Sequence, residues 1–340
     1  MNNSKTYSIF IFLSIVLVAM FFVNLAVGSL AIPVSEVFSV LFKGEVGKPS
    51  WEYIVLGFRL PKAIVAILTG ISLPIAGMLM QSLFRNPMAE PYVLGLSSGA
   101  SLGVALVVLG AGLLPLGIQQ YATSAYSLVL ASVAGSFLVL FAVLLAINKV
   151  KSTATLLIIG LMFSSFAGAF VGVLSYFSTA EDLKRFTFWA MGSLSNHSWH
   201  DIFILFVATF AGIIICLFLI KSLNTLMLGE SYAQTMGVNI RKTRYQIIIA
   251  TGILRGSITA FVGPIAFIGL AVPHISRIVF KTGNHFVLFF ANMIIGAIVL
   301  LLSDTLSQIP GSSMVLPINA VTSIIGAPIV ISMLLKHKNI

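Results

Sequence analysis

Three observations predict that this chain folds as an all-helical protein that crosses a membrane many times. Hydrophobic residues make up 59% of its 340 residues and charged residues only 8%, where a soluble domain carries about 25% charged residues. Apolar runs of about twenty residues recur from end to end, and each is long enough to cross a hydrocarbon core about 30 Å thick. Lys and Arg collect in the short segments between the runs. A water-soluble fold is therefore excluded.

We expect ten membrane-spanning helices with both chain ends in the cytoplasm, because Lys and Arg favour the cytoplasmic side of a membrane. The expected spans are residues 8–30, 60–83, 92–113, 122–147, 153–176, 201–221, 245–262, 265–281, 286–306 and 317–335. The first apolar run is longer than that of a signal peptide and leads into further spans, so we expect an uncleaved first helix.

The composition also limits the chemistry. The net charge of +10 arises in the segments between the apolar runs, so it indicates membrane orientation rather than nucleic-acid binding. The single cysteine, Cys216, can form no internal disulfide, and His274 has no companion ligand at metal-binding spacing. No phosphate-binding Gly-x-x-x-x-Gly-Lys-Ser/Thr sequence occurs. We therefore predict no catalytic residue, no metal site and no cofactor on this chain.

Small and helix-breaking residues indicate how the spans pack. Glycines recur at four-residue spacing, which lets helix backbones approach closely in lipid; they are Gly95, Gly99 and Gly103, then Gly168 and Gly172, then Gly252 and Gly256. Prolines within or beside the apolar runs predict irregular helices around an internal path; they are Pro74, Pro87, Pro91, Pro264, Pro273, Pro317 and Pro328.

Several cations do not follow the positive-inside pattern, among them Lys184 and Arg185 in an expected outer loop, and three others invite a functional interpretation. Arg59 and Lys62 lie at the outer end of the second span, where they are either solvated loop charges or contacts for a partner. Arg255 falls near the middle of span 245–262, where an Arg costs about 2.5–3.5 kcal/mol on insertion scales. It must face protein or water, so it either lines a conduit for anionic substrates or bonds to neighbouring carbonyls.

Three stretches carry a resemblance to a known family. The first holds Arg59-Leu-Pro-Lys62 and Arg85-Asn-Pro-Met-Ala-Glu-Pro91, the second holds Gly229-Glu230 with Ala233 and Gly237, and the third holds Pro273-His-Ile-Ser-Arg277. Together they resemble the FecCD permease family of ABC importers for iron-siderophores, haem and cobalamin. Asn86, Pro87, Pro91, Pro273, His274 and Arg277 are the matching motif positions.

This resemblance implies the fold and the function. Residues 1–340 would form one transmembrane permease domain of the type II ABC importer fold, in a bacterial inner (plasma) membrane. A second permease, expected to be identical, would pair with it. A dimer of separate ATPase subunits would bind ATP and Mg, and a periplasmic or lipid-anchored binding protein would deliver the substrate. The chain itself would not be an enzyme.

The resemblance also assigns roles to residues. The segment from about 223 to 244 would couple to the ATPase through Gly229, Glu230, Ala233 and Gly237. A short helix there is also favoured by Glu230 at its start and by Gly237 as a left-handed stop. Arg59 and Lys62 would dock the binding protein. Ser152 and Thr153 would form the cytoplasmic gate, although a cap on the following helix accounts for them equally well.

The sequence departs from its relatives at three positions. Leu316 stands where they often carry Glu, Asn319 replaces a common Gly, and Gln308 stands where the cobalamin permease carries a docking Arg. The last difference weakens an assignment to cobalamin. The competing function is a secondary transporter driven by an ion gradient, but the chain has only nine acidic residues, most of them at span edges.

Overall fold

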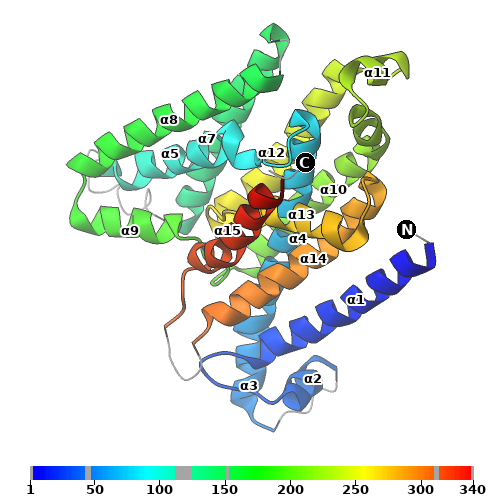
Figure 1. The fold of residues 1–340 in the computed structure, drawn as a ribbon. Helices are drawn as coiled ribbons and strands as arrows, with labels where there is room; N and C mark the ends of the chain where they lie inside the picture. Colours follow the sequence, from blue (N-terminus) through cyan, green and yellow to red (C-terminus); the bar gives the residue numbers. More distant parts are fainter. Residues whose placement is uncertain (1–2, 43–46, 112–123, 151–152, 310–313, 338–340) are drawn as a thin grey trace. The chain divides into compact units, whose positions relative to one another are not determined.

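The structure is a computed structural model that describes residues 3–42, 47–111, 124–150, 153–309 and 314–337 (Figure 1). Within these ranges the regular secondary structure is helical, apart from an isolated antiparallel bridge between Gln308 and Val315. The elements are α1 (Asn3–Ala26), α2 (Val34–Phe42), α3 (Pro49–Ile54), η1 (Val55–Arg59), α4 (Leu60–Phe84), η2 (Pro91–Leu94), α5 (Leu96–Val108), α7 (Ala125–Lys149), α8 (Thr153–Phe177), α9 (Ala180–Ala190), α10 (Trp199–Leu226), α11 (Glu230–Thr235), α12 (Ile240–Val262), α13 (Ile268–Phe280), α14 (His285–Ser307) and α15 (Ile318–His337).

The described helices confirm the predicted polytopic membrane fold. Seven are long and apolar enough to cross a membrane: Ser4–Ala26, Pro49–Phe84, Ala125–Ala146, Ala154–Phe177, Trp199–Leu226, Ile240–Val262 and His285–Ser307. Three shorter apolar helices, Leu96–Val108, Ile268–Phe280 and Ile318–Ser332, coincide with the other three predicted spans. The first two of these have 13 residues each and rise about 20 Å, which is less than the hydrocarbon thickness. The expectation of irregular helices around an internal path stays a prediction.

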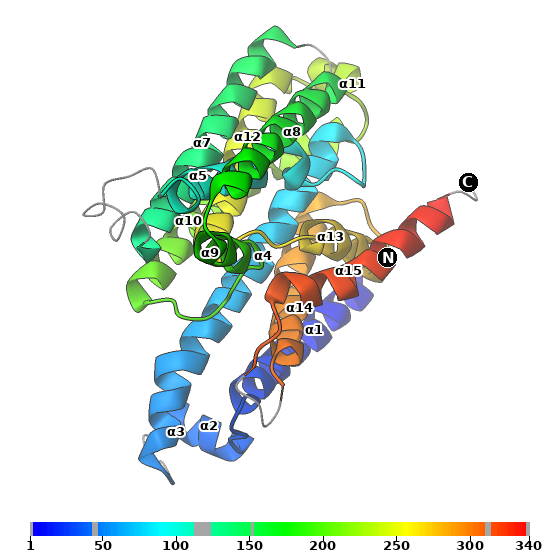
Figure 2. The ribbon, with the colours of Figure 1, turned by 90° about the vertical axis from the view of Figure 1, so that its left-hand side faces the viewer.

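The chain forms two compact units, and each is described by itself. The first comprises Met1–Pro74, Ser193–Val207 and Ile265–Ile340. In it α1 packs along α14, and α13 and α15 also contact α14 (Figures 1 and 2). Gly70 of α4 faces Gly296 of α14, and a Cβ atom on either glycine would collide with the carbonyl oxygen of the other. The prediction of a single permease domain stays a prediction.

The second unit comprises Ile75–Gly192 and Ala208–Pro264. Its centre is α5, which packs against α7, α8, α9 and α12 (Figure 2). A Cβ atom on Gly99 would lie 2.5 Å from the carbonyl oxygen of Gly135, so α5 and α7 touch through their backbones. One on Gly252 would lie 2.7 Å from Leu140 Cδ2. The predicted close helix contacts are therefore confirmed at these positions.

The prediction fails within this chain for the glycine pair on α8. No described atom lies within 4 Å of the place where a Cβ atom of Gly168 or Gly172 would stand. The neighbouring side chains Phe166 and Phe170 are exposed as well. This side of α8 faces away from the described remainder of the protein, so its small residues make no helix contact here.

Candidate functional site

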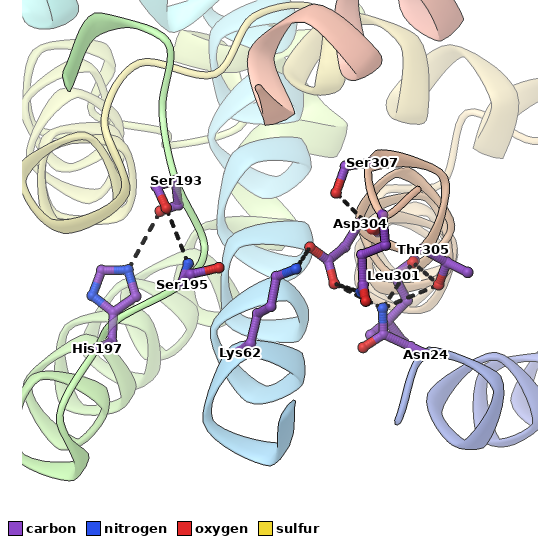
Figure 3. A network of polar contacts seen from close by, with 10 residues as sticks. Asn24, Lys62, Ser193, Ser195, His197, Leu301, Asp304, Thr305 and Ser307 are labelled. Atoms are coloured by element: carbon purple, nitrogen blue, oxygen red, sulfur yellow. Dashed lines mark hydrogen bonds and ion pairs between the residues drawn. The ribbon is translucent and has the colours of Figure 1, made fainter. Parts of the chain in front are cut away.

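A polar network in the first unit joins α1, α4 and α14 (Figure 3). The Nζ atom of Lys62 lies 2.8 Å from Oδ1 of Asp304, and their side chains are 14% and 2% exposed. The Nδ2 group of Asn24 donates to Oδ2 of Asp304 at 2.9 Å and to Oγ1 of Thr305 at 3.1 Å. Gln308 Nε2 donates to the same Asp304 oxygen at 3.3 Å. The buried carboxylate is thus compensated by one cation and two amides.

Arg59 lies beside this network and caps the end of α1. Its Nη1 group donates to the carbonyl oxygens of Leu25 at 2.7 Å and Ala26 at 2.9 Å, and its Nη2 group donates to that of Leu30. The last carbonyl groups of a helix lack partners within the helix, and a cation there also complements the helix dipole. A Cβ atom on Gly28 would lie 2.6 Å from Arg59 Nη2, so a larger residue there would force the guanidinium to shift.

A cavity of about 340 Å³ lies next to the end of α1 in the first unit. Its wall combines the turn after α1, the start of α4 and the segment after α14. The residues that line it are Gly28, Ser29, Leu30, Ile54, Phe58, Arg59, Lys62, Gln308, Ile309, Met314 and Val315. Its two charged groups are therefore the two cations that the sequence analysis singled out for docking.

The structure gives Arg59 and Lys62 internal partners that sequence reasoning missed. Arg59 is 9% exposed and holds backbone carbonyls, and Lys62 is paired with Asp304. The alternative of freely solvated loop charges is therefore wrong. Both residues still line the cavity, and docking of a binding protein there stays a prediction. A lone aspartate in an apolar run was the available signal, because a buried carboxylate requires a cation or hydrogen-bond donors.

The predicted coupling segment in the second unit contains a short helix, α11, as expected. Gly229 and Gly237 flank it with φ angles of 114° and 83°, which favour glycine. Arg244 Nη2 of α12 lies 2.7 Å and 2.8 Å from the two carboxylate oxygens of Glu230. Ala233 is fully buried. The ion pair thus fastens α11 to α12, and the coupling role of these residues stays a prediction.

Several apolar side chains of this segment are exposed on the protein surface. The exposed side chains are Met227, Leu228, Tyr232 and Met236, with 49%, 65%, 51% and 60% of their surface accessible. They lie on both sides of Glu230, which is itself partly exposed. A mixed surface of this kind suits contact with another protein.

The Asn-Pro motif forms the connection between α4 and η2. Asn86 Oδ1 accepts from the backbone N–H of Met88 at 2.9 Å, and the Asn86 carbonyl accepts from Ala89 at 3.0 Å. This local turn brings Glu90 into the interior, where it is 8% exposed. Pro91 then begins η2, at a position that needs no helical N–H donor. The motif therefore builds a tight turn that is exposed at Asn86 and buried at Glu90.

Arg255 lies inside the second unit and is 1% exposed. Its Nε group donates to Ser97 Oγ of α5 at 3.3 Å. This buried hydrogen bond to a side chain supports the structural alternative. A role in the substrate pathway stays a prediction.

The third motif lies on α13 of the first unit. Pro273 is inside this helix and Arg277 is in its last turn, while His274 is partly buried. Sequence reasoning missed the group that holds the start of α13, which is Asn319: its Oδ1 accepts from the backbone N–H of Ala266 at 3.0 Å. Its only signal was the departure from the common glycine.

The remaining predictions concern the cytoplasmic gate and metal binding. Ser152 lies outside the described residues, and Thr153 begins α8 while its side chain is not among those described. The gate therefore stays a prediction. Among the described residues, no group of three or more His, Cys, Asp or Glu side chains could hold a metal ion.

In the described part of the chain, the fold and sites define a polytopic helical membrane protein with a short helix, α11, that exposes apolar side chains, and with a cavity lined by two cations. Residues 16–336 match the FecCD transport family. The chain belongs to this family, as the three motifs indicated, and the activity to be explained is transport.

The chain is also similar to individual permease proteins and to a solved transporter structure. The chain is 33% identical to the uncharacterized ABC transporter permease protein YvrB of Bacillus subtilis, over 92% of this chain and 89% of the relative. It is 36% identical to the vitamin B12 import system permease protein BtuC of Salmonella typhi, over 84% of each chain. A solved structure described as an inward-facing metal-chelate type ABC transporter superposes with a TM-score of 0.83 at 29% identity, over 97% of this chain and 99% of that one.

Proposed function

We propose that this protein is the membrane-spanning permease subunit of an ATP-driven importer for a metal chelate or a cobalamin-like cofactor. The observation that carries this proposal is α11. It is a short helix with exposed apolar side chains, fastened to a long membrane helix by the Glu230–Arg244 pair. A soluble partner that binds α11 and moves it would also move α12, to which the ion pair fastens it.

The proposal gives the chain three kinds of partner. Two ATPase subunits bind ATP and Mg and contact the 223–244 segment from the cytoplasm. A binding protein delivers substrate and contacts the cavity that Arg59 and Lys62 line. A second copy of this permease completes the path, with Ser152 and Thr153 at its inner gate. Both chain ends lie in the cytoplasm of a bacterial cell in this arrangement.

Substrate class follows from the relatives and from the chain's own chemistry. One relative is named for vitamin B12 import and one solved structure for metal-chelate transport. Large chelates are recognised mainly by their binding protein in this proposal, so the permease needs a wide path rather than a dedicated ligand site. Iron-siderophore, haem and cobalamin are the three substrates to compare.

Reconstitution tests this function. The permease is placed in liposomes with its cognate ATPase and binding protein, and uptake of labelled cobalamin, ferric siderophore and haem is measured. We expect uptake of one of them that requires both ATP and the binding protein. Uptake driven by a proton or sodium gradient without ATP would instead establish the secondary transporter.

A further inference from the structure

One apolar side of the short helix α2 is left exposed by the described part of the chain. Val34, Phe38 and Phe42 recur at four-residue spacing, so they share one face of the helix. Their accessible fractions are 49%, 46% and 67%. The adjoining apolar face is buried through Val37 and Val40. The apolar part of the surface of α2 is therefore wider than the part that the protein covers.

The polar residues of α2 lie on its remaining side. Ser35 is exposed, and Ser39 is half-buried on the same side. The Oε2 atom of Glu36 accepts from the backbone N–H of Gly47 at 3.2 Å, shortly before α3 begins. A separation into an apolar and a polar side is typical of helices that lie along the boundary between lipid and water.

A lipid-facing side of α1 leads towards this exposed face. The span Ser4–Ala26 is long and apolar enough to cross a membrane, and only 17% of its most apolar window is buried inside the protein. Exposed apolar side chains recur along one side of α1 at spacings of three and four residues, as expected for a helix in contact with lipid; they are Tyr7, Ile11, Ile15 and Val18. The next position of this series is Phe22.

Aromatic contacts join the two helices at the level of the membrane surface. The ring centroid of Phe22 lies 6.2 Å from that of Phe38, which in turn lies 4.7 Å from that of Phe42. The 23 residues of the span rise about 35 Å, slightly more than the hydrocarbon core of about 30 Å. Phe22 is in the last two turns of α1, so it lies near the edge of that core. Figures 1 and 2 show α2 beside this end of α1.

We infer that α2 is an interfacial helix whose partner is the phospholipid bilayer, with Val34, Phe38 and Phe42 inserted between the lipids at the membrane surface. Helices of this kind bury their apolar face about 5–10 Å into the boundary between headgroups and acyl chains. Aromatic side chains are enriched at this depth. α3 supplies a further one, Tyr53, which is 69% exposed and makes an edge contact of 5.5 Å with Phe58.

Charge contributes little to this contact. Residues 34–54 hold three Glu and two Lys, a net charge of −1, so anionic headgroups are not attracted and the apolar side chains supply the binding. The cavity wall at Gly28, Ser29 and Leu30, just after α1, then lies at the membrane surface. The inference does not depend on the proposed function, because it requires only that α1 spans the membrane.

Spin labels on the full-length permease in phosphatidylcholine vesicles test this contact. The single cysteine is buried and is removed by Cys216→Ala, after which Phe38→Cys or Phe42→Cys introduces a labelling site. Electron paramagnetic resonance compares collisions of each label with oxygen, which concentrates in the bilayer, and with a water-soluble nickel chelate. Ser35→Cys is the matched control on the polar side of α2, and Ile15→Cys is the reference for lipid exposure on α1.

We expect the oxygen-to-nickel collision ratio at positions 38 and 42 to be several-fold higher than at position 35 and lower than at position 15. Adding phosphatidylglycerol to the vesicles should leave the ratio unchanged. Val34→Cys probes the same face if the Phe variants do not fold. The measurement needs neither ATP nor substrate, so its result is independent of whether the protein is an importer.

Three results would overturn the inference. Nickel collisions as frequent at position 42 as at position 35 would place α2 in water. Rare collisions with both reagents at positions 38 and 42 would show that protein, such as a second copy of the permease, covers this face. A high ratio only in the presence of phosphatidylglycerol would show that charge, rather than apolar insertion, holds α2 at the membrane.

Discussion

Lys62 of α4 and Asp304 of α14 form an ion pair of 2.8 Å at the wall of the cationic cavity. The carboxylate is almost fully buried, and the ammonium keeps 14% of its surface exposed. Asn24 of α1 bonds the second carboxylate oxygen. One acidic residue therefore holds three helices of the first unit together, and its loss should be felt as a loss of stability.

We expect Lys62→Met to lower the free energy of unfolding by about 3 kcal/mol, because breaking a buried pair leaves an uncompensated charge. Lys62→Met combined with Asp304→Leu should cost less than the sum of the single changes. The Tm of the wild type, the two single variants and the double variant is measured by intrinsic fluorescence in detergent. Lys221→Met, at an exposed position on α10, is the matched control. Additive losses would show that the two side chains do not interact.

Docking at the cavity predicts an effect that is separate from stability. Charge reversal at Arg59 and Lys62 should weaken binding of the partner protein, but it should also release α1 and Asp304 from their internal bonds. Exposed ion pairs are worth only about 0–1 kcal/mol. We therefore expect a modest loss of affinity for Lys62→Gln in folded protein, largest at low salt. Equal affinity at low salt, measured on the folded fraction, would contradict docking through this residue.

Apolar runs and basic segments were enough to predict ten helices, because the bilayer fixes how long a span must be. They did not predict that α5 begins at Leu96 instead of residue 92. The cause is local: Pro91 starts a separate short helix and Gly95 has a φ of 79°, which a continuous helix cannot accommodate. The signals were in the sequence, but their effect depends on packing.

Side-chain partners were harder to predict than helices. Asp304 lies 242 residues after Lys62, and no periodic pattern connects them. Arg59 was assigned to docking because its charge opposed the orientation rule, whereas the structure shows that it also satisfies carbonyl groups at the end of α1. Glu90 was treated only as part of a motif. Its burial was not predicted, because it depends on how the turn after α4 packs.

The glycine contacts predict a contrast between two substitutions. Gly296→Ala should strongly destabilise the permease, because its Cβ atom would collide with the backbone of Gly70 and force α4 and α14 apart. Gly168→Ala adds the same methyl group to α8, where there is open space. It should leave Tm unchanged or slightly raised, since Ala favours helices by about 1 kcal/mol over Gly. Equal Tm values for the two variants would contradict the close packing of α4 and α14.

The Glu230–Arg244 pair predicts how the coupling segment works. Glu230→Lys places two cations together and should release α11 from α12, so uptake should be lost while the chain still inserts in the membrane. Exchange of the charges, with Glu230→Arg and Arg244→Glu together, restores an ion pair in which the cation is on α11 and the anion on α12. We expect this exchange to recover part of the uptake, because the contact between the two helices returns.

Two measurements on these variants decide the role of the segment. Membrane-inserted permease and co-purified ATPase are quantified first, and ATP-dependent uptake is then measured per assembled complex. Gly237→Val serves as a second perturbation, because a φ of 83° is strained for a β-branched residue and the end of α11 should shift.

Loss of uptake in Glu230→Lys with recovery on charge exchange assigns the pair to fastening α11. Loss without recovery assigns Glu230 to direct contact with the ATPase, since its carboxylate is partly exposed beside the apolar surface of the segment. Normal uptake by both Glu230→Lys and Gly237→Val in assembled complexes would remove the segment from the coupling route.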